Sequence, residues 1–258
     1  MQATNNLQVH DLCVSFGGLQ AVNKVSFSLK PECLGALIGP NGAGKTTVFN
    51  ALTGLCNVSS GQIEFGNEPI ANQPPHFIAR RGIARTFQNI RLFKNLTVLD
   101  NLRIAYHQNR KYSLLSGIFR TSKFRQEEMW ITAQAEEALR LVGLSERSLS
   151  LAGSLPYGEQ RRVEIARALM LHPRLLLLDE PAAGMNPQET QTLLRLIRTL
   201  RDNLKISILL IEHDMKLVMN LCEELFVLDY GELIATGCPQ TVQNDPRVIQ
   251  AYLGGKPA

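Results

Sequence analysis

Residues 39–47 read GPNGAGKTT and match the phosphate-binding pattern G-x-x-x-x-G-K-[ST] at Gly39, Gly44, Lys45 and Thr46. The glycines of such a loop let the backbone wrap around a phosphate and aim N–H groups at it. The lysine neutralises the β- and γ-phosphate oxygens, and the threonine hydroxyl can ligate Mg²⁺. A strand-like run, LGALI, precedes the loop and a helix-like run, TTVFNALTGL, follows it. We therefore predict a P-loop whose nucleotide contacts are Gly39, Pro40, Asn41, Gly42, Ala43, Gly44, Lys45, Thr46 and Thr47.

The rest of the chain has the composition of an ordinary globular protein. Of its 258 residues 45% are hydrophobic and 19% charged, and the net charge of +4 does not by itself indicate nucleic acid. No apolar run reaches the roughly 18 residues that cross a bilayer, and the N-terminus has no signal-peptide pattern. The five scattered cysteines form no CxxC pair, which indicates buried or idle thiols in a reducing compartment. We expect a soluble, cytosolic protein.

The apolar patterns around the loop predict an α/β fold. Residues 7–38 alternate short strand-like runs with glycine-containing turns, and another strand is expected near 62–65. The runs RLLLLDE and KISILLIEHD are short and continuously apolar and end in acids, which is typical of buried parallel strands. The run FVLDYGELIATG predicts a hairpin that turns at Tyr230 and Gly231.

A mostly helical insertion is expected between about 90 and 155. Residues 96–108 and 124–142 have helical patterns, and a basic connector lies between them. A solvated helical face is the interpretation that we favour for the connector, and contact with lipid head groups or nucleic acid is the alternative. The connector spans about 110–125 and carries Arg110, Lys111, Arg120, Lys123 and Arg125.

Two adjacent acids follow a buried strand in LLLLDEP, residues 175–181. Open α/β sheets bind ligands at the carboxyl ends of their strands, which is where these acids lie. Asp179 fits a role in binding Mg²⁺, directly or through water. Glu180 can then polarise a water in line with the γ-phosphate as a general base.

A second strand, ISILLIEHD, is expected to bring Glu212, His213 and Asp214 to the same sheet edge. His213 is the candidate for a γ-phosphate contact, because an imidazole can donate one hydrogen bond while its other nitrogen is held by a neighbour. The residue type of Gln88, in RTFQNIRLF, does not by itself indicate a function. Its amide can complete the shell of Mg²⁺, although most glutamines are simply exposed.

A second candidate anion site lies in LPYGEQRRVEIARAL, residues 155–169. Gly158 comes at the start of an expected helix, where free N–H groups and the helix dipole attract negative charge. The chain thus has two phosphate-binding signals more than a hundred residues apart.

In their order and spacing these motifs resemble those of the ATP-binding subunits of ABC transporters. GPNGAGKTT, TFQN, LPYGEQRR, LLLLDEPAAGMNP and IEHDM are similar to the Walker A, Q-loop, signature, Walker B with D-loop, and H-loop motifs of that family. The resemblance covers nearly the whole chain. It is strongest to the LivG-type subunits of bacterial branched-chain amino acid importers, because of DEPAAGMNP, IEHDMKLVM, the insertion SLLSGIFRTSKFR and the ending VIQAYLG.

The resemblance implies a single ABC ATPase domain over residues 1–258, in the α/β class of P-loop NTPases. A RecA-like catalytic core with an N-terminal antiparallel β subdomain is expected at about 1–88 and 156–258. A helical subdomain that includes the approach to the signature is expected at about 89–155.

The resemblance also explains the second phosphate signal. Subunits of this family dimerise head to tail, and each signature completes the ATP site on the partner's P-loop. Gly158 and Glu159 are therefore expected to act in trans, on a nucleotide held by another chain. Gly158 would permit close backbone approach, and the dipole of its helix would favour the phosphate charge.

Site residues follow from the family's motifs. The resemblance implies ATP and Mg²⁺ as cofactors, with Mg²⁺ held by Thr46, Gln88 and Asp179. Glu180 and His213 are the expected catalytic residues, and Gln88 also senses the γ-phosphate. Phe16, in VSFGG, matches the aromatic residue that stacks on adenine; without the resemblance it would be read as a core strand residue.

Two positions depart from the widespread family pattern. Pro156 stands where the signature usually has a serine, which removes a hydroxyl and a backbone donor, although proline is tolerated just before a helix. Asn186 stands where the D-loop usually has an aspartate, which keeps hydrogen bonding but loses a charge. We interpret both as features of the branched-chain branch rather than as signs of an inactive site.

The resemblance predicts an ATPase that drives a bacterial importer of branched-chain amino acids from the cytoplasmic face of the inner membrane. Its partners would be a second ATPase subunit (a homologous chain or another copy), membrane permease subunits and a periplasmic solute-binding protein. The apolar residues that follow Gln88 would form the groove for a permease helix, with Phe93 exposed: Ile90, Leu92, Phe93, Leu96, Val98 and Leu99. Importers of urea or short amides are the alternative cargo systems.

Other functions fit the sequence less well. A soluble ABC protein that works on nucleic acid usually has two cassettes or a long coiled-coil insertion, and this chain shows neither, so no nucleic-acid partner is expected. A GTPase would need an N-K-x-D motif, but the only Asn-Lys pair, Asn23-Lys24, is followed by Val-Ser. A scaffold that does not hydrolyse its nucleotide would have no need of Glu180.

Overall fold

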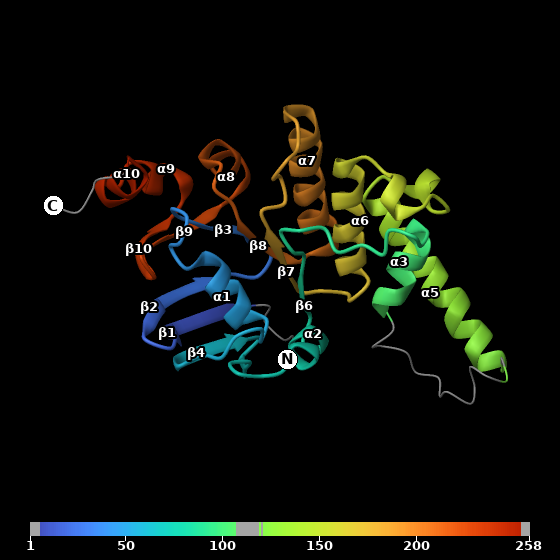
Figure 1. Cartoon of the computed structure of the whole chain (residues 1–258), viewed down its shortest axis with the longest axis horizontal. Helices are drawn as coiled ribbons and strands as arrows, with labels where there is room; N and C mark the ends of the chain where they lie inside the picture. The colour runs from blue at the N-terminus through green and yellow to red at the C-terminus, as the bar shows by residue number, and fades with distance from the viewer. Residues whose placement is uncertain (1–5, 107–118, 120, 254–258) are drawn as a thin grey trace. The chain divides into compact units, whose positions relative to one another are not determined.

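The computed structural model describes residues 6–106, 119 and 121–253, coloured along the chain in Figure 1. The described residues form two compact units. The first, here called the core unit, takes its residues from 1–85, 174–183 and 197–258. The second, the helical unit, takes its residues from 86–173 and 184–196.

One sheet of the core unit is antiparallel, with the strand order β2-β1-β4-β5. Its strands alternate buried and exposed residues because one face packs on the core, as in β2, where Val25, Phe27 and Leu29 are buried. The predicted β-rich N-terminal part is confirmed. The strands are β1 (Leu7–Phe16), β2 (Leu19–Leu29), β4 (Ser60–Phe65) and β5 (Glu68–Pro69).

The second sheet of the core unit has the order β10-β9-β3-β8-β7-β6, and only the pair β9–β10 is antiparallel. Every residue of β3, β7 and β8 is buried, which explains their continuously apolar sequences. The predicted hairpin turn at Tyr230 and Gly231 is confirmed. The strands are β3 (Leu34–Ile38), β6 (Ile83–Arg85), β7 (Leu175–Asp179), β8 (Ser207–Ile211), β9 (Glu224–Asp229) and β10 (Glu232–Gly237).

The parallel register brings several motifs to one edge of this sheet. Ile211, the last residue of β8, pairs with Leu37 in β3 and with Asp179 in β7. The P-loop therefore leaves the sheet beside the acids after β7 and the Glu212-His213 pair after β8.

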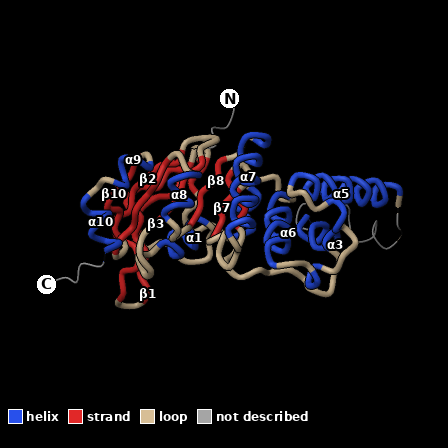
Figure 2. The backbone as a smooth tube through the Cα atoms, turned by 90° about the horizontal axis from the view of Figure 1, so that it is seen from above, coloured by secondary structure: helices blue, strands red, loops and turns tan. Residues whose placement is uncertain are grey.

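Helices of the core unit pack around the two sheets, whose strands (red in Figure 2) gather side by side. β2 also contacts β10, so that both sheets share one apolar core with Phe49, Phe65 and Phe226 fully buried. Of the cysteines, Cys13, Cys33 and Cys222 are buried and Cys238 is exposed. The helices are α1 (Lys45–Leu52), α2 (Pro75–Arg80), α8 (Met215–Leu221), α9 (Pro239–Gln243) and α10 (Pro246–Leu253).

The described part of the helical unit is built from helices joined by loops (blue and tan in Figure 2). The helices are α3 (Val98–Ala105), α5 (Ser122–Leu141) and α6 (Tyr157–Leu169), which pack against one another, with short 3₁₀ turns at Ser145–Arg147 and Ala152–Ser154. Thr97 and Thr121 cap α3 and α5, each accepting from a backbone N–H three residues on. The two predicted helices are confirmed, although the first ends at Ala105.

The boundary of the helical part differs from the expected one at about 155. α6 packs on α3 and α5, so the helical unit continues to residue 173. The unit also includes the first turns of α7 (Pro187–Leu204), whose residues from 197 onward belong to the core unit. A boundary taken from the motif order misses this, because it assigns a helix by its neighbour in sequence rather than by what it packs against.

None of the helices among the described residues is both long and apolar enough to cross a bilayer. Most of the basic connector, including Arg110, Lys111 and Arg120, lies outside the described residues. Lys123 and Arg125 are exposed on α5.

Candidate nucleotide site

The P-loop connects β3 to α1 through backbone conformations that only glycine adopts without strain. Gly39 has a φ of +145°, and a Cβ on it would lie 2.0 Å from the carbonyl oxygen of Leu228 in β9. Gly44, the residue before α1, has a φ of +98°, and its Cβ would lie 2.7 Å from the Ala21 carbonyl oxygen in β2. The loop is thus pressed between two strands, and its glycines are needed for that close approach.

Lys45 begins α1 and its ammonium is held at the loop. Its Nζ donates to the carbonyl oxygens of Gly39, at 2.7 Å, and Pro40, at 2.8 Å. Burial lowers the pKa of Lys45, and the negative charges of Glu180 and Asp179 oppose that shift. The first N–H groups of α1 have no partner inside the helix, so the loop and the helix end together present donors and a cation to an anion.

Asp179 ends β7 and is 5% exposed. Its Oδ2 accepts from Nη2 of Arg85, at the end of the neighbouring strand β6, at 2.7 Å. Nη1 of the same guanidinium donates to Oδ1 of Asn50, at 2.8 Å. Arg85 was not among the predicted site residues, because its sequence signal is only a basic residue at the end of a short strand. The pair neutralises Asp179 and fixes the direction of its carboxylate.

Oxygen donors suit Mg²⁺, and the core unit supplies two of the three expected ligands. Thr46, in the first turn of α1, is exposed and provides a hydroxyl, and Asp179 provides a carboxylate. Gln88 belongs to the helical unit. The residues present in the core unit therefore fit Mg²⁺ beside the phosphates.

Glu180 has a φ of +45°, an unusual conformation for a residue with a side chain. Its backbone N–H donates to the Ile211 carbonyl oxygen at 3.0 Å, which ties the turn to the end of β8. Such a conformation costs about 1–3 kcal/mol. The Oε1 of Glu180 lies 4.0 Å from Nδ1 of His213, whose side chain is 60% exposed. The structure thus brings the two expected catalytic residues together.

Glu212 lies between these residues in sequence but has a different position. It is 1% exposed, and its Oε1 accepts from the Ala182 N–H at 3.1 Å. Burial raises the pKa of Glu212, and that hydrogen bond opposes the shift. The buried carboxylate of Glu212 therefore anchors the turn that follows Glu180 through its hydrogen bond with Ala182. Its place at the sheet edge was predicted, but this anchoring was not.

Phe16 ends β1 and is 51% exposed, so its ring is accessible to a ligand. It pairs with Leu19 at the tip of the β1–β2 hairpin. Ala21, two residues further on, is the residue that approaches Gly44. Phe16 is thus exposed at the hairpin tip rather than buried in the core.

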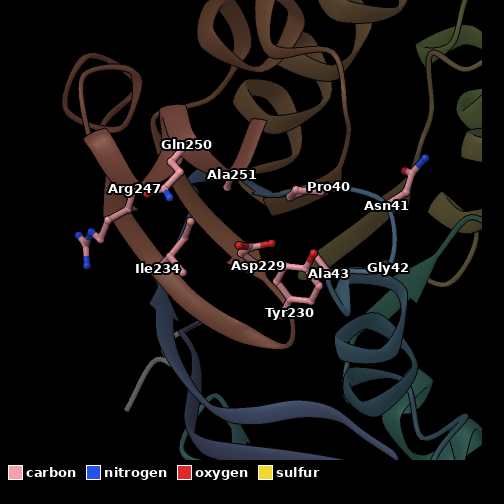
Figure 3. A pocket seen from close by; sticks show the side chains of 10 residues that line it. All are labelled: Pro40, Asn41, Gly42, Ala43, Asp229, Tyr230, Ile234, Arg247, Gln250 and Ala251. Atoms are coloured by element: carbon pink, nitrogen blue, oxygen red, sulfur yellow. The ribbon is translucent and has the colours of Figure 1, made fainter. Parts of the chain in front are cut away.

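A cavity of about 550 Å³ opens on another side of the P-loop. In Figure 3, Asp229 and Tyr230 from the β9–β10 hairpin lie between the loop and α10, and the Arg247 guanidinium points away from the loop. Tyr252 of α10 packs beside Gly39, and burial raises the pKa of its hydroxyl to about 12 against the effect of the Gly39 backbone. The cavity is lined by Pro40, Asn41, Gly42, Ala43, Asp229, Tyr230, Ile234, Arg247, Gln250 and Ala251.

The second candidate anion site lies in the helical unit. The helix expected to open at Gly158 is α6, which begins one residue earlier, at Tyr157; Gly158 lies in its first turn, with Pro156 as the extended residue before the helix. Oε2 of Glu159 lies 3.3 Å from Nε of Arg147. A cavity of about 310 Å³ opens beside Gly158.

Gln88, also in the helical unit, is exposed. Its backbone carbonyl accepts from Nη2 of Arg161 in α6 at 2.7 Å, and the Phe87 carbonyl accepts from Nη1, also at 2.7 Å. Arg161 is fully buried and pairs with Glu164 at 2.9 Å. The segment around Gln88 is therefore anchored to the helix that begins at the signature. The sequence analysis did not predict this role of Arg161.

Comparison with known families accounts for the order of these features. The family described as ABC transporter matches residues 22–183, from β2 through the P-loop and signature to the turn after Glu180. This chain belongs to that family. ATP hydrolysis is characteristic of ABC ATPases, and the chain is one of them.

Individual ABC ATPases are similar to the chain over nearly its full length. The high-affinity branched-chain amino acid transport ATP-binding protein BraF of Pseudomonas aeruginosa is 48% identical, with 96% of this chain and 97% of BraF covered. LivG of Escherichia coli, a protein of the same description, is 47% identical with the same coverage. An ATP-binding cassette of an ABC transporter solved in its ADP conformation has a TM-score of 0.83 at 32% identity, with 96% and 98% covered.

The C-terminal segment carries a narrower match among ABC ATPases. Residues 232–258 match the family described as branched-chain amino acid ATP-binding cassette transporter. Within the described residues this segment contains β10, α9 and α10, and therefore the wall of the cavity in Figure 3 that faces the P-loop.

The apolar region after Gln88 is partly exposed in this ABC ATPase. Phe93 is 52% exposed, which confirms the prediction, and Val98 is fully buried in α3. Leu92, Leu96 and Leu99 are half-buried. Only part of this region therefore serves the core of the helical unit.

Proposed function

We propose that this chain is the ATP-hydrolysing subunit of a bacterial importer for branched-chain amino acids. The descriptions of BraF and LivG, both nearly half identical to it, support the transport system and the cargo. The match of residues 232–258 to a branched-chain amino acid family supports the same cargo. The observation that carries the enzymatic part is the convergence of the P-loop, Asp179-Glu180 and Glu212-His213 at one sheet edge.

Phosphate binding falls to the P-loop and α1. The nucleotide contacts are residues 39–47, with N–H groups of the loop and helix end directed at the β- and γ-phosphates. Lys45 now donates to two loop carbonyls, at 2.7 and 2.8 Å, and exchanges them for phosphate oxygens when ATP binds. The exposed ring of Phe16 stacks on the adenine.

Hydrolysis falls to Glu180 and His213. Glu180 accepts a proton from the attacking water as the new O–P bond forms and the bond to ADP breaks. His213 contacts the γ-phosphate through the imidazole face that solvent now reaches. Thr46, Asp179 and Gln88 would hold Mg²⁺, which neutralises charge that develops on the phosphate oxygens.

The signature acts on a second subunit. Gly158 and Glu159, at the start of α6, complete the nucleotide site of another ATPase chain, either a homologous chain or a second copy. Two features support this use: Gly158 opens a helix, whose end favours an anion, and a cavity opens beside it. ATP then holds the two chains together until it is hydrolysed.

The association and separation of the two ATPase chains are transmitted to the permease subunits through the region that follows Gln88. Phe93 provides exposed apolar surface in this region. The chain accordingly lies at the cytoplasmic face of the membrane, and a periplasmic solute-binding protein delivers the cargo.

Two measurements test this function. Replacing Glu180 by glutamine should lower ATP turnover about 10²–10⁴-fold while ATP binding is kept. Glu32→Gln is the matched control, because Glu32 precedes β3 at the opposite edge of the sheet. In vesicles that contain the chain with its permease and solute-binding protein, leucine should stimulate both ATP hydrolysis and uptake. Stimulation by urea or acetamide in place of leucine would contradict the proposed cargo.

A further inference from the structure

The glycine at the start of α6 is covered by an acidic side chain from another helix. Gly158 is buried, and a Cβ placed on it would lie 2.8 Å from Oε1 and 3.1 Å from Cδ of Glu189. Glu189 lies in the first turn of α7, which follows the turn after β7. Both residues line the same cavity of about 310 Å³.

Glu189 is held in this position by a reciprocal cap. Its Oε2 accepts from the Asn186 N–H at 3.0 Å, and Oδ1 of Asn186 accepts from the Glu189 N–H at 2.9 Å. This is a capping box, with Pro187 at the first helical position. One carboxylate oxygen therefore serves the cap, and the other faces Gly158.

The nearby basic side chains are engaged elsewhere. Arg162 lines the same cavity, but its Nη1 donates to the carbonyl oxygens of Val142, at 3.0 Å, and Gly143, at 3.4 Å. Arg147 pairs with Glu159.

We propose that Glu189 is an internal competitor for the γ-phosphate at the signature, and so sets the ATP concentration at which two subunits associate. This inference rests on the proposed function, in which Gly158 binds a phosphate held by the partner chain. A phosphate that approaches Gly158 meets the Glu189 carboxylate at the same helix end. Like charges a few ångströms apart repel each other, so the side chain must rotate away before the phosphate can bind.

The proposal also links two motifs within one chain. When the carboxylate leaves Gly158, its bond to the Asn186 N–H is strained or broken, because the same carboxyl group makes both contacts. Phosphate binding at the signature therefore changes the hydrogen bonding of Asn186, in the segment between Glu180 and α7. Glu189 is a positioning residue in this scheme, since it does not touch the reacting atoms.

The variant that isolates the charge is Glu189→Gln. A glutamine at this position also completes a capping box, so the cap and the fold are kept while the negative charge is lost. Glu137→Gln is the control, because it removes the same charge from an exposed pair with Arg140 elsewhere in the helical unit. Thermal unfolding of both variants should match that of the parent.

The experiment uses the full chain with Glu180→Gln as the parent, so that bound ATP is not hydrolysed. Association is followed by sedimentation velocity as Mg-ATP is titrated. We expect Glu189→Gln to lower the ATP concentration for half-maximal association about tenfold, and Glu137→Gln to leave it unchanged. The difference should shrink in 0.5 M salt and be absent with ADP, which has no γ-phosphate.

The outcomes separate this inference from the proposed function. If the parent does not associate with ATP, the use of the signature in trans between two copies of this chain is wrong. If the parent associates but Glu189→Gln does so at the same ATP concentration, or if Glu137→Gln has the same effect, the role of Glu189 is overturned.

Discussion

Replacing Arg85 by leucine would leave the carboxylate of Asp179 without its partner inside the nucleotide site. The two side chains are only 6% and 7% exposed, and Nη2 and Oδ2 lie 2.7 Å apart. Removing one partner of a buried pair costs about 3–5 kcal/mol, because the other charge stays buried without compensation. For a chain of this size that corresponds to a fall in Tm of about 6–20 °C.

Arg81→Leu is the matched control. Arg81 precedes β6, at the opposite end of the strand from Arg85, and pairs with Glu68, but the two side chains are 37% and 48% exposed. An exposed pair is worth about 0–1 kcal/mol, so this variant should lower Tm by no more than about 4 °C.

The assay is thermal unfolding of Arg85→Leu, Arg81→Leu, Asp179→Asn and the double variant Arg85→Leu/Asp179→Asn. Neutralising Asp179 should restore part of the lost stability, with a coupling free energy of at least about 2 kcal/mol between the two sites. A loss below about 1 kcal/mol for Arg85→Leu, or additive effects in the double variant, would refute the reasoning.

Three further predictions concern the P-loop, α10 and the permease surface. Gly39→Ala should abolish binding of a fluorescent ATP analogue, because the added Cβ would lie 2.0 Å from the Leu228 carbonyl oxygen. Gly18→Ala is the control and should bind normally, because a Cβ on Gly18 would have nothing within 4 Å. Equal binding by both variants would contradict the packing described for the loop. Because the pKa of Tyr252 is raised to about 12, its contribution to stability is present below pH 10 and lost between pH 10 and 12. Over that range the free energy of unfolding of the wild type should fall by about 2–3 kcal/mol more than that of Tyr252→Phe; parallel curves would show that the hydroxyl is not buried. Phe93→Ser should lower the free energy of unfolding by about 1 kcal/mol, since nearly half of Phe93 is buried, but should abolish stimulation of ATP hydrolysis by the permease; unchanged stimulation would place the permease elsewhere.

The parts of the fold that the sequence predicts are those whose signals are local. Buried parallel strands such as β7 and β8 are continuously apolar, and a two-residue turn at Tyr230 and Gly231 separates two strand-like runs. The P-loop glycines are predicted for the same reason, since the motif and its flanking elements lie within about twenty residues. Strand order then brings Glu180 and His213 together without further information.

The contacts that the sequence does not predict join residues far apart in the chain. Arg85 and Asp179 are 94 positions apart, and Arg161 and Phe87 are 74 apart. Nothing in a local pattern selects such a pair, because many arginines and acids are available and packing makes the choice. The assignment of α6 to the helical unit is of the same kind.

The capping box at α7 is the exception. The run NPQE, residues 186–189, has an N-cap residue, a proline at the first helical position and a glutamate at the third. The bonds between Asn186 and Glu189 fit these signals but were not among the predictions made from the sequence. The signals do not predict that the same glutamate covers Gly158, since that contact depends on how α6 and α7 pack.

Mixing two inactive variants tests the sharing of one nucleotide site between two chains most directly. Lys45→Ala removes the P-loop cation and Gly158→Glu blocks the signature, so each variant alone should lack ATP hydrolysis. In a mixed dimer the P-loop of the second variant meets the signature of the first, and random mixing should restore about a quarter of the wild-type rate, since about half of the dimers are mixed and each has one intact site of two. The test is made at a concentration at which the wild-type chain hydrolyses ATP. A mixture as inactive as its components would contradict the account, because each chain would then complete its own site.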